Sequence, residues 1–265
     1  MSGQGRLRIV RSGDQSVVHT ARATSPLKFL LPRNHGAGAW AFVTNLGGGL
    51  VDGDAIDVEL DVGPGAVALL GTQSATKVYR SPQGTRQSLR GRVGEDALLV
   101  VPSDPVLCFA GARYLQTVEL ELARGASVVF VDGLLAGREA RGERWAFARY
   151  ESRVRVRREG KLFLHDALLL DPAHGGVAAR MGRFGAVVTV LAVGPAAVAV
   201  RERALAMAQR PQAGAAEVFS AAPVADDAIL GRVAGPSAAS AAAFVRALLA
   251  PVTLRLGDDP FERKW

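Results

Sequence analysis

Hydrophobic and polar residues alternate in short runs that recur along this chain. In residues 56–62, IDVELDV, apolar and acidic positions alternate, and after a turn at GPGA the chain continues as the mostly apolar VALLGT. Alternation with a period of two is typical of a strand with one exposed face, whereas a short apolar run is typical of a strand buried on both faces. The pattern therefore predicts a half-buried strand, a tight turn and a buried strand.

This unit recurs in looser form along the chain. Residues 89–93 turn at GEDA and resume as LLVVPS, residues 115–122 turn at ARGA and resume as SVVFVD, residues 153–158 turn at EGK and resume as LFLHDA, and a weaker unit runs from Val187 through VGPAA into VAVRER. One such strand pair cannot bury its own apolar face, so successive units should stack around a shared core. The sequence predicts a mainly β fold, an irregular β-helix or a stack of β-hairpins; a meander of ordinary hairpins would give the same pattern.

Helices are expected only in the C-terminal third. Residues 201–210, RERALAMAQR, favour helix by composition and end before a proline. Residues 237–249 begin with serine, are rich in alanine and leucine, and end shortly before Pro251. The intervening residues 211–236 are rich in Ala, Pro and Gly, so we expect them to be partly mobile.

The composition of the 265 residues, 49% of them hydrophobic, is sufficient for a sizeable core. No linker divides the chain, so we expect a single β domain over residues 1–265 with a helical addition at about 200–250. Neither a signal peptide nor a membrane span is expected, which makes the cytoplasm the default location. The lone Cys108 excludes an internal disulfide and is expected to be a small buried hydrophobe. Trp265 is either a docked end or a frayed tail.

The chain is basic, with a net charge of +7, and only four of its 32 basic residues are lysines. Such a balance is compatible with a nucleic-acid or acidic-protein partner. The densest run, Arg153 to Arg158, lies on an expected strand whose alternate positions face solvent, and few aromatic residues accompany it. A basic nucleic-acid-binding module, with salt-sensitive affinity, therefore stays an alternative interpretation.

Residues 45–81 are rich in glycine but match no common enzyme signature: they have neither the GxGxxG nor the GxxxxGK[ST] spacing. Asp52 and Asp54 would share one face of a strand, and paired carboxylates catalyse glycoside hydrolysis. A β-helix carbohydrate-active enzyme is thus a second alternative, although aspartate in such a segment more often stabilises a turn. Ser74 or Ser81 near Lys77 is formally a Ser/Lys pair, for which polar surface is the simpler interpretation.

Metal-ligating residues are sparse. His165 and Asp166 are adjacent, so on a strand they point to opposite faces and cannot hold one ion together. Asp171 and His174 could meet in the loop LLLDPAHGG, where they would form a weak, transient metal site. The sequence predicts no tight metal site and no stably bound cofactor.

Three segments in order, GGGLVDGD, VGPGA and TQSATKVYRS, resemble the urease accessory protein D family. SPLKFLLPR at 25–33, VPSDPVLCFAGA, RGASVVFVDGLLAGREARGERWAF and the final RKW fit the same family, so the resemblance extends from about residue 25 to 170 and is weaker beyond. The chain departs from the family pattern at two places. Asp52 occupies a variable position of the first motif, and Ser103 and Asp104 stand where the family often has an acidic residue in VPSDPVLCFAGA. Residue by residue, the resemblance points to Gly48, Gly49, Gly53, Asp54, Thr76, Lys77, Tyr79, Arg80 and Ser81 as contacts for a partner or as members of a polar path.

The resemblance implies a non-enzymatic chaperone or scaffold with a β-helical fold and a helical addition. Such a protein binds apo-urease and accessory protein F, which recruits the GTPase accessory protein G, and the assembly supports insertion of nickel(II) into urease. Membrane and nucleic acid are not among the implied partners, and nickel(II) would be in transit. Because a hydrated divalent cation cannot cross an apolar core, a passage would need polar residues in the interior. Asp54, Thr76 and Lys77 either tie two β layers together or present a polar surface to a partner or ion.

Overall fold

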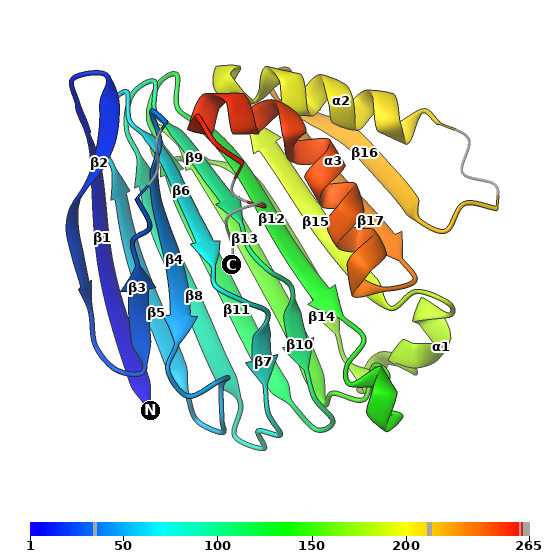
Figure 1. Cartoon of the computed structure of the whole chain (residues 1–265). Coiled ribbons are helices and arrows are strands. Elements are labelled where there is room, and N and C mark those ends of the chain that lie inside the picture. The colour runs from blue at the N-terminus through cyan, green and yellow to red at the C-terminus, as the bar shows by residue number, and fades with distance from the viewer. Residues whose placement is uncertain (34–35, 211–213, 260, 262–265) are drawn as a thin grey trace.

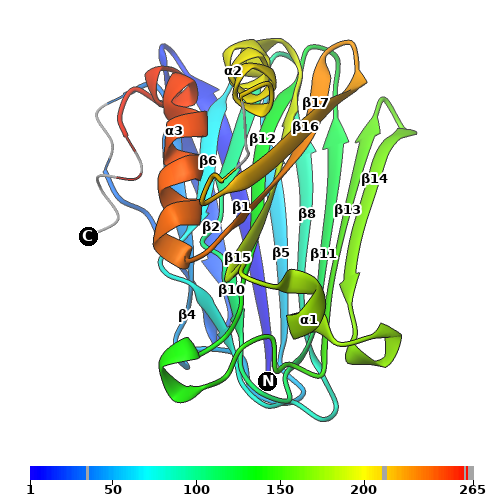
Figure 2. The ribbon, with the colours of Figure 1, turned by 90° about the vertical axis from the view of Figure 1, so that its right-hand side faces the viewer.

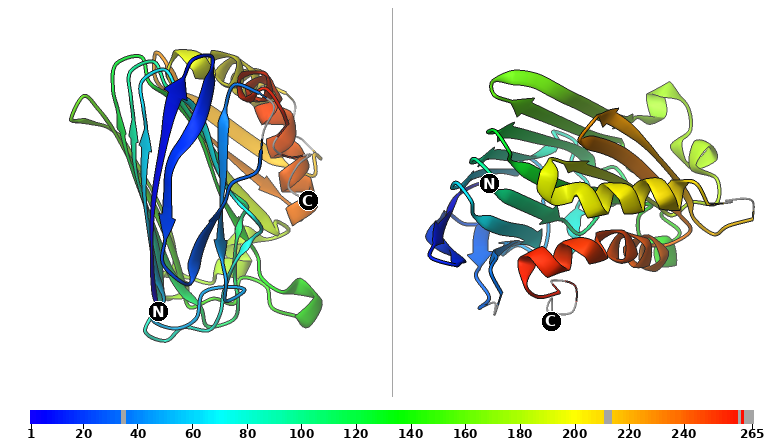
Figure 3. Two further views of the ribbon diagram at one scale, coloured as in Figure 1. Left: turned by 60° about the vertical axis from the view of Figure 1, so that its left-hand side comes forward. Right: turned by 90° about the horizontal axis from the view of Figure 1, so that it is seen from above.

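Two β-sheets face each other across an apolar core in the computed structural model, which describes residues 1–33, 36–210, 214–259 and 261 (Figure 1). Helices cover the outer face of one sheet, whereas the outer face of the other is open (Figure 3). His35, Pro211, Trp265 and the final RKW motif lie outside the described residues. The mainly β class expected from the sequence is confirmed.

The open sheet has seven strands in the order β14-β13-β11-β8-β5-β1-β2. Their bounds are β1 Ser2–Ser12, β2 Gln15–Ala23, β5 Ala55–Val62, β8 Thr85–Val93, β11 Arg113–Leu122, β13 Arg149–Arg158 and β14 Lys161–Leu170. The five central strands are mutually parallel, and hairpin partners β2 and β14 close the two edges in antiparallel pairing.

The covered sheet has ten strands, eight of them in the order β16-β17-β15-β12-β9-β6-β4-β3; of the other two, β10 pairs with β12, and β7 pairs with β10. Their bounds are β3 Leu27–Leu30, β4 Ala39–Asn45, β6 Val67–Thr72, β7 Thr76–Val78, β9 Leu98–Pro102, β10 Val106–Cys108, β12 Ser127–Leu135, β15 Ala186–Val193, β16 Val218–Ala225 and β17 Ala228–Gly235. The helices are α1 Val177–Met181, α2 Val198–Ala208 and α3 Ala238–Leu256, with 3-10 turns at Glu139–Arg141, Pro172–His174 and Pro195–Ala197.

In the first three repeat units the two strands lie in different sheets and do not pair with each other, whereas the two strands of the 153–158 unit, β13 and β14, form an antiparallel hairpin within the open sheet. β5 pairs with β1 and β8 in the open sheet, and β6 pairs with β4 and β9 in the covered sheet. Each of these three units is therefore an arch that stacks in parallel on equivalent strands of its neighbours. Ala66, Ala97 and Ala126, at most 3% exposed, end successive arch turns inside the core, where a larger side chain would not fit.

Two apolar cores result, one between the sheets and one between the covered sheet and the helices. Helix α3 begins with a capping box at Ser237, and its buried side faces the sheet. The buried residues of α3 are Ala241, Val245, Leu248, Leu249, Val252 and Leu256. By length and composition alone this helix could cross a membrane, but its apolar side packs on the sheet. Figure 2 shows α2 and α3 side by side along this face.

Three details of the C-terminal third differ from the expectations. Residues 218–235, expected to be mobile, form the β16–β17 hairpin. The segment VAVRER, expected as a strand, forms the start of α2 instead. Helix α3 continues through Pro251 because Val252 and Leu256 extend its buried stripe, and the Thr253 hydroxyl donates to the Ala250 carbonyl oxygen (2.8 Å). Alanine-rich strands carry too weak an alternation to be recognised in the sequence.

Arginine and acidic residues alternate across the outer face of the open sheet, a feature that we term the charge ladder. In register across β1, β5, β8, β11 and β13, one row contains Arg6, Glu59, Arg90, Glu119 and Arg155, and the next contains Arg8, Asp61, Arg92, Glu121 and Arg157. Glu119 pairs with both Arg90 (3.6 Å) and Arg155 (3.3 Å). Opposite charges on neighbouring strands favour the observed register, so much of the basic charge is matched within the sheet.

We expect reversal of the Glu119 charge to destabilise the open sheet. Glu119→Lys replaces two attractive pairs by like charges, which should lower the free energy of unfolding by about 1–2 kcal/mol, and by less in high salt. Urea unfolding at low and high ionic strength measures both effects. Glu95→Lys, at an exposed turn position of the same sheet, is the matched control; an equal loss in both variants would show that the ladder contributes nothing specific.

Candidate functional site

A cavity of about 200 Å³ lies between the two sheets. Its wall is formed by β4, β5, β6, β8, β9, β11 and β12 and by the segments 44–49 and 72–77. Exposed Gly48, Ser74 and Lys77 belong to this lining, so the cavity opens to solvent at these segments. It is large enough for several water molecules, provided that polar groups are present to bind them.

Polar side chains from neighbouring strands of the open sheet form one in-register row on its inner face. Gln87 of β8 is opposite Gln116 of β11, which is opposite Ser152 of β13. The Tyr114 hydroxyl contacts the side-chain oxygens of both glutamines, and Gln116 Nε2 donates to Ser152 Oγ (3.3 Å). Because parallel strands in register align equivalent positions, three single polar residues far apart in sequence become one continuous stripe.

Asp132 of β12 faces this row from the covered sheet. Its Oδ2 accepts a hydrogen bond from Ser152 Oγ (2.6 Å), which joins the two sheets. In the covered sheet Asp132 is in register with Thr189 of β15, and Thr189 with Arg232 of β17. Arg232 pairs with Asp166 of β14 in the open sheet, so a line of polar positions in register leads from Asp132 to an ion pair between the two sheets.

Burial raises the pKa of the Asp132 carboxyl above its ordinary value, and the charge of Asp166 adds to this effect, whereas the hydrogen bond from Ser152 opposes it. Burial likewise raises the pKa of Tyr114 and Tyr150, with the Asp132 charge as a second cause. Asp132 is enclosed between the sheets and still partly accessible, so its accessible surface faces the cavity that it lines. A buried carboxylate that faces a cavity open to solvent is a candidate ligand for a cation.

Four of the residues indicated by the sequence, Gly48, Gly49, Thr76 and Lys77, line the mouth of this cavity. Gly49 has a φ of 153°, and an added Cβ would lie 2.7 Å from the Lys77 carbonyl oxygen. Leu50 N donates to that oxygen (2.8 Å), which ties the glycine-rich loop to β7. The Lys77 backbone thus ties the loop after β4 to β7, and Thr76 and Lys77 lie in the cavity lining; a role of either residue toward a partner or an ion stays a prediction.

Asp54 and Gly53, in contrast, form a turn outside the cavity lining. The Asp54 side chain is buried, and it accepts hydrogen bonds from the Val51 amide (2.9 Å) and from the amino group of Met1. Asp52 Oδ1 accepts from the amides of Gln83 (2.8 Å) and Gly84. The two carboxylates hold loops and do not line an open cleft, so the glycosidase hypothesis finds no support.

The remaining motif residues stabilise the same end of the sandwich. Ser81, fully buried, accepts from the Arg113 amide (2.9 Å) and donates to the Arg113 carbonyl oxygen (3.2 Å). This excludes Ser81 as an accessible nucleophile beside Lys77. Tyr79 stacks edge-on against Phe109, with ring centroids 5.1 Å apart. Arg80 is exposed.

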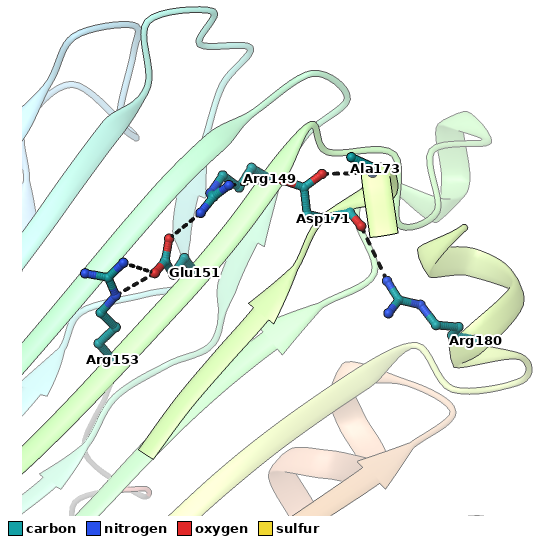
Figure 4. A network of polar contacts seen from close by, with 6 residues as sticks. All are labelled: Arg149, Glu151, Arg153, Asp171, Ala173 and Arg180. Carbon is teal, nitrogen blue, oxygen red and sulfur yellow. Dashed lines mark hydrogen bonds and ion pairs between the residues drawn. The ribbon is translucent and has the colours of Figure 1, made fainter. Parts of the chain in front are cut away.

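Asp171, which the sequence suggested as a weak metal ligand with His174, makes contacts with other protein groups in the loop after β14 (Figure 4). Asp171 pairs with Arg149 (3.1 Å) and accepts from the Ala173 amide (2.9 Å), and both contacts lower the pKa of Asp171. Arg149 also pairs with Glu151 (2.9 Å). His174 is exposed. In the described parts of the chain, no three His, Cys, Asp or Glu side chains come together as metal ligands.

Cys108 is buried, as expected, and burial strongly raises the pKa of its thiol. The sequence reasoning missed Gln87, Gln116, Asp132 and Ser152, which form the centre of the site. A signal was present, because Asp132 interrupts the apolar run VVFVDGLL, and Gln116 lies in LQTVELEL at a position in phase with the buried Val118, Leu120 and Leu122. A polar residue at a position that the alternation assigns to the core is the pattern that identifies such a site.

Comparison with known proteins gives one consistent family. The sequence profile of the family described as UreD urease accessory protein matches residues 1–265. A urease accessory protein UreD from Sorangium cellulosum is 51% identical over 264 residues, which cover 100% of this chain and 85% of the relative. One from Anaeromyxobacter sp. is 46% identical, covering 99% and 89%. Urease accessory protein D from Arabidopsis thaliana is 37% identical over 198 residues, covering 72% and 67%.

We expect substitutions of the two neighbouring glycines to differ sharply in their cost. Gly49→Ala should lower the free energy of unfolding by about 2–4 kcal/mol, because its Cβ meets the Lys77 carbonyl oxygen in a backbone conformation that L-residues avoid. Gly48 has a φ of 70°, but the space around an added Cβ is open, so Gly48→Ala should lower the free energy of unfolding by only about 1 kcal/mol. Chemical denaturation of both variants tests this, and similar losses would contradict the close contact.

Asp132 should give the stability a distinctive pH dependence. Because its pKa is higher in the folded than in the unfolded chain, its contribution is largest at low pH and is lost as pH rises from 3.8 through the higher folded value. Asp132→Asn removes this titration. The stability of the wild type minus that of the variant should therefore decrease as the pH rises above 3.8, as measured by urea unfolding. A difference that is constant or increases with pH would refute the raised pKa.

Proposed function

The chain belongs to the UreD family of urease accessory proteins, and from this premise we propose that it is a scaffold for nickel(II) insertion. A role in urease maturation rather than catalysis follows from the family itself, whose members here are named as accessory proteins. The proposal adds three points: the chain binds apo-urease, it acts in a complex with accessory proteins F and G, and nickel(II) is the cargo of its interior cavity.

The observation that carries this proposal is the polar row inside an otherwise apolar sandwich. Moving a divalent cation from water into an apolar interior is prohibitively unfavourable unless protein oxygens replace its water ligands. The side-chain oxygens of Gln87, Gln116 and Asp132 line one cavity, and Ser152 links two of them by hydrogen bonds. These groups could exchange with water around a passing cation step by step.

The chemistry of the donor set favours transit over storage. Amide, hydroxyl and carboxylate oxygens bind nickel(II) less tightly than imidazole or thiolate ligands do, so cargo can leave as well as enter. Two carboxylates, Asp104 and Asp132, line the cavity, and the raised pKa of Asp132 allows proton and cation to compete for its oxygen atoms. Weak, exchangeable binding is what a protein that hands on a metal requires.

The other functions considered from the sequence receive less support. The open sheet carries its arginines in alternation with acidic residues, and nucleic-acid binding instead needs unmatched positive charge over a continuous surface. The absence of membrane and nucleic-acid partners, and the cytoplasmic location, stay predictions.

Two variants of the polar row test the cargo path. Asp132→Asn removes the charge with little change of shape, and Gln116→Leu places an apolar group in the row; each should reduce nickel per urease several-fold at limiting nickel. The measurement is the nickel content and activity of urease co-expressed with F, G and the variant chain.

Glu59→Gln, on the outer face of the same sheet, is the matched control and should load urease normally. Purified variants must still bind apo-urease, which separates transfer from assembly. Full nickel loading by both row variants, at wild-type protein levels, would exclude the cavity as the path.

A further inference from the structure

The outer face of the open sheet is uncovered and carries the charge ladder (Figure 3). Its five central strands are parallel, and a parallel sheet usually has both of its faces covered by other elements. Helices α2 and α3 pack on the other sheet and leave this face open. The open face is therefore a candidate surface for a partner, and its charge pattern indicates which one.

The charges of the ladder form stripes, because each strand carries one sign of charge in both rows. We term the eight residues on the four strands next to one another the stripe face: Glu59 and Asp61 of β5, Arg90 and Arg92 of β8, Glu119 and Glu121 of β11, and Arg155 and Arg157 of β13. Because arginines and carboxylates are equal in number, the stripe face has no net charge. It offers no long-range attraction to a uniformly charged partner such as nucleic acid.

The stripe face is complementary to a copy of itself. The strand order is β13-β11-β8-β5, so a two-fold axis parallel to the strands and above the gap between β11 and β8 places β8 over β11 of the second copy and β5 over β13. An acidic stripe then faces a basic stripe at every one of the four positions. A two-fold interface uses the same patch on both subunits, and this is tolerated only when the patch complements itself.

The charges of the stripe face are incompletely paired within the chain. In the part of the chain that the structure describes, Glu59 and Arg92 make no ion pair. Glu119 pairs with Arg90 at 3.6 Å, a long contact that leaves the Arg90 side chain 62% exposed and the Glu119 side chain 47% exposed. All eight residues line an open hollow of about 440 Å³. The side chains of a facing copy therefore find both space and unused charge.

We propose that the stripe face is the interface of a homodimer, in which a second copy of this chain covers the open sheet. Each exposed ion pair contributes little, so the dimer is weak and sensitive to salt. Because the axis is parallel to the strands, the two copies keep the same strand direction and their cavity mouths open at the same end of the dimer. The inference goes beyond the proposed function and does not rest on it.

Sedimentation velocity of the full-length chain alone, over a series of concentrations, tests the proposal. The wild type should be a monomer and dimer in equilibrium at low salt, and the dissociation constant should rise about tenfold or more when the salt concentration is raised from about 50 mM to about 500 mM. A chain that stays monomeric at low salt overturns the proposal, as does a dimer that salt does not weaken.

Two charge-reversal variants identify the surface. Glu59→Arg with Asp61→Arg reverses the β5 stripe, and Arg155→Glu with Arg157→Glu reverses the β13 stripe. Each variant alone brings like charges together twice across the two-fold axis, which should weaken its dimer about tenfold or more. In an equimolar mixture, the reversed stripes face each other with opposite charge, and so do the unreversed ones. The mixture should therefore form heterodimers of nearly wild-type affinity, a recovery that a folding defect cannot produce.

Glu202→Arg and Arg203→Glu, at exposed positions of α2, are the matched controls and should leave the dimer unchanged. Dimers that the stripe variants do not weaken, or two folded variants that do not combine, would contradict the proposal. Loss of apo-urease binding by the stripe variants of a chain that is itself monomeric would assign the stripe face to urease, against the proposal. Should a double variant not fold, the single variants Glu59→Arg and Arg155→Glu give the same comparison, with folding checked by thermal unfolding.

Discussion

Parallel hydrogen bonding between equivalent strands of successive arches is the constraint on which this structure depends. β1, β5, β8, β11 and β13 pair in register in the open sheet, as do β4, β6, β9 and β12 in the covered one. A shift of one residue would exchange the two faces of every strand. The same register that aligns apolar residues in the core also aligns the arginines and carboxylates of the charge ladder outside and the polar row inside.

The polar row is a local conflict with the hydrophobic core that surrounds it. Buried polar groups are tolerated when each finds a partner, and here a chain of hydrogen bonds connects Gln87, Tyr114, Gln116, Ser152 and Asp132. Burial nevertheless raises the pKa of the Asp132 carboxyl, because its charged form loses solvation in the core. A cost of this kind in the centre of a core is typical of a functional site.

The glycine-rich motif connects the fold with the site. Its glycines let the loop after β4 approach β7 closely enough for backbone hydrogen bonding, and the same loop then carries Leu46 and Val51 at the surface. Asp52, Asp54 and Ser81 hold the neighbouring turns through backbone contacts. The motif is therefore largely a set of structural residues that shapes an opening, and its Lys77, Tyr79 and Arg80 are exposed at the surface.

The sequence by itself determined the mainly β class, the exposed and buried face of most strands, the helices near 201–210 and 237–249 and, through its motifs, the family. These properties depend on local periodicity and composition, which neighbouring residues encode. Only the tertiary structure showed that the arch strands stack in parallel, that 218–235 is a hairpin, and that Gln87, Gln116 and Asp132 share one cavity. Alternation with a period of two indicates which face of a strand a residue occupies, but it does not indicate which strand lies beside it. The site exists only because strands that are distant in sequence pair with each other.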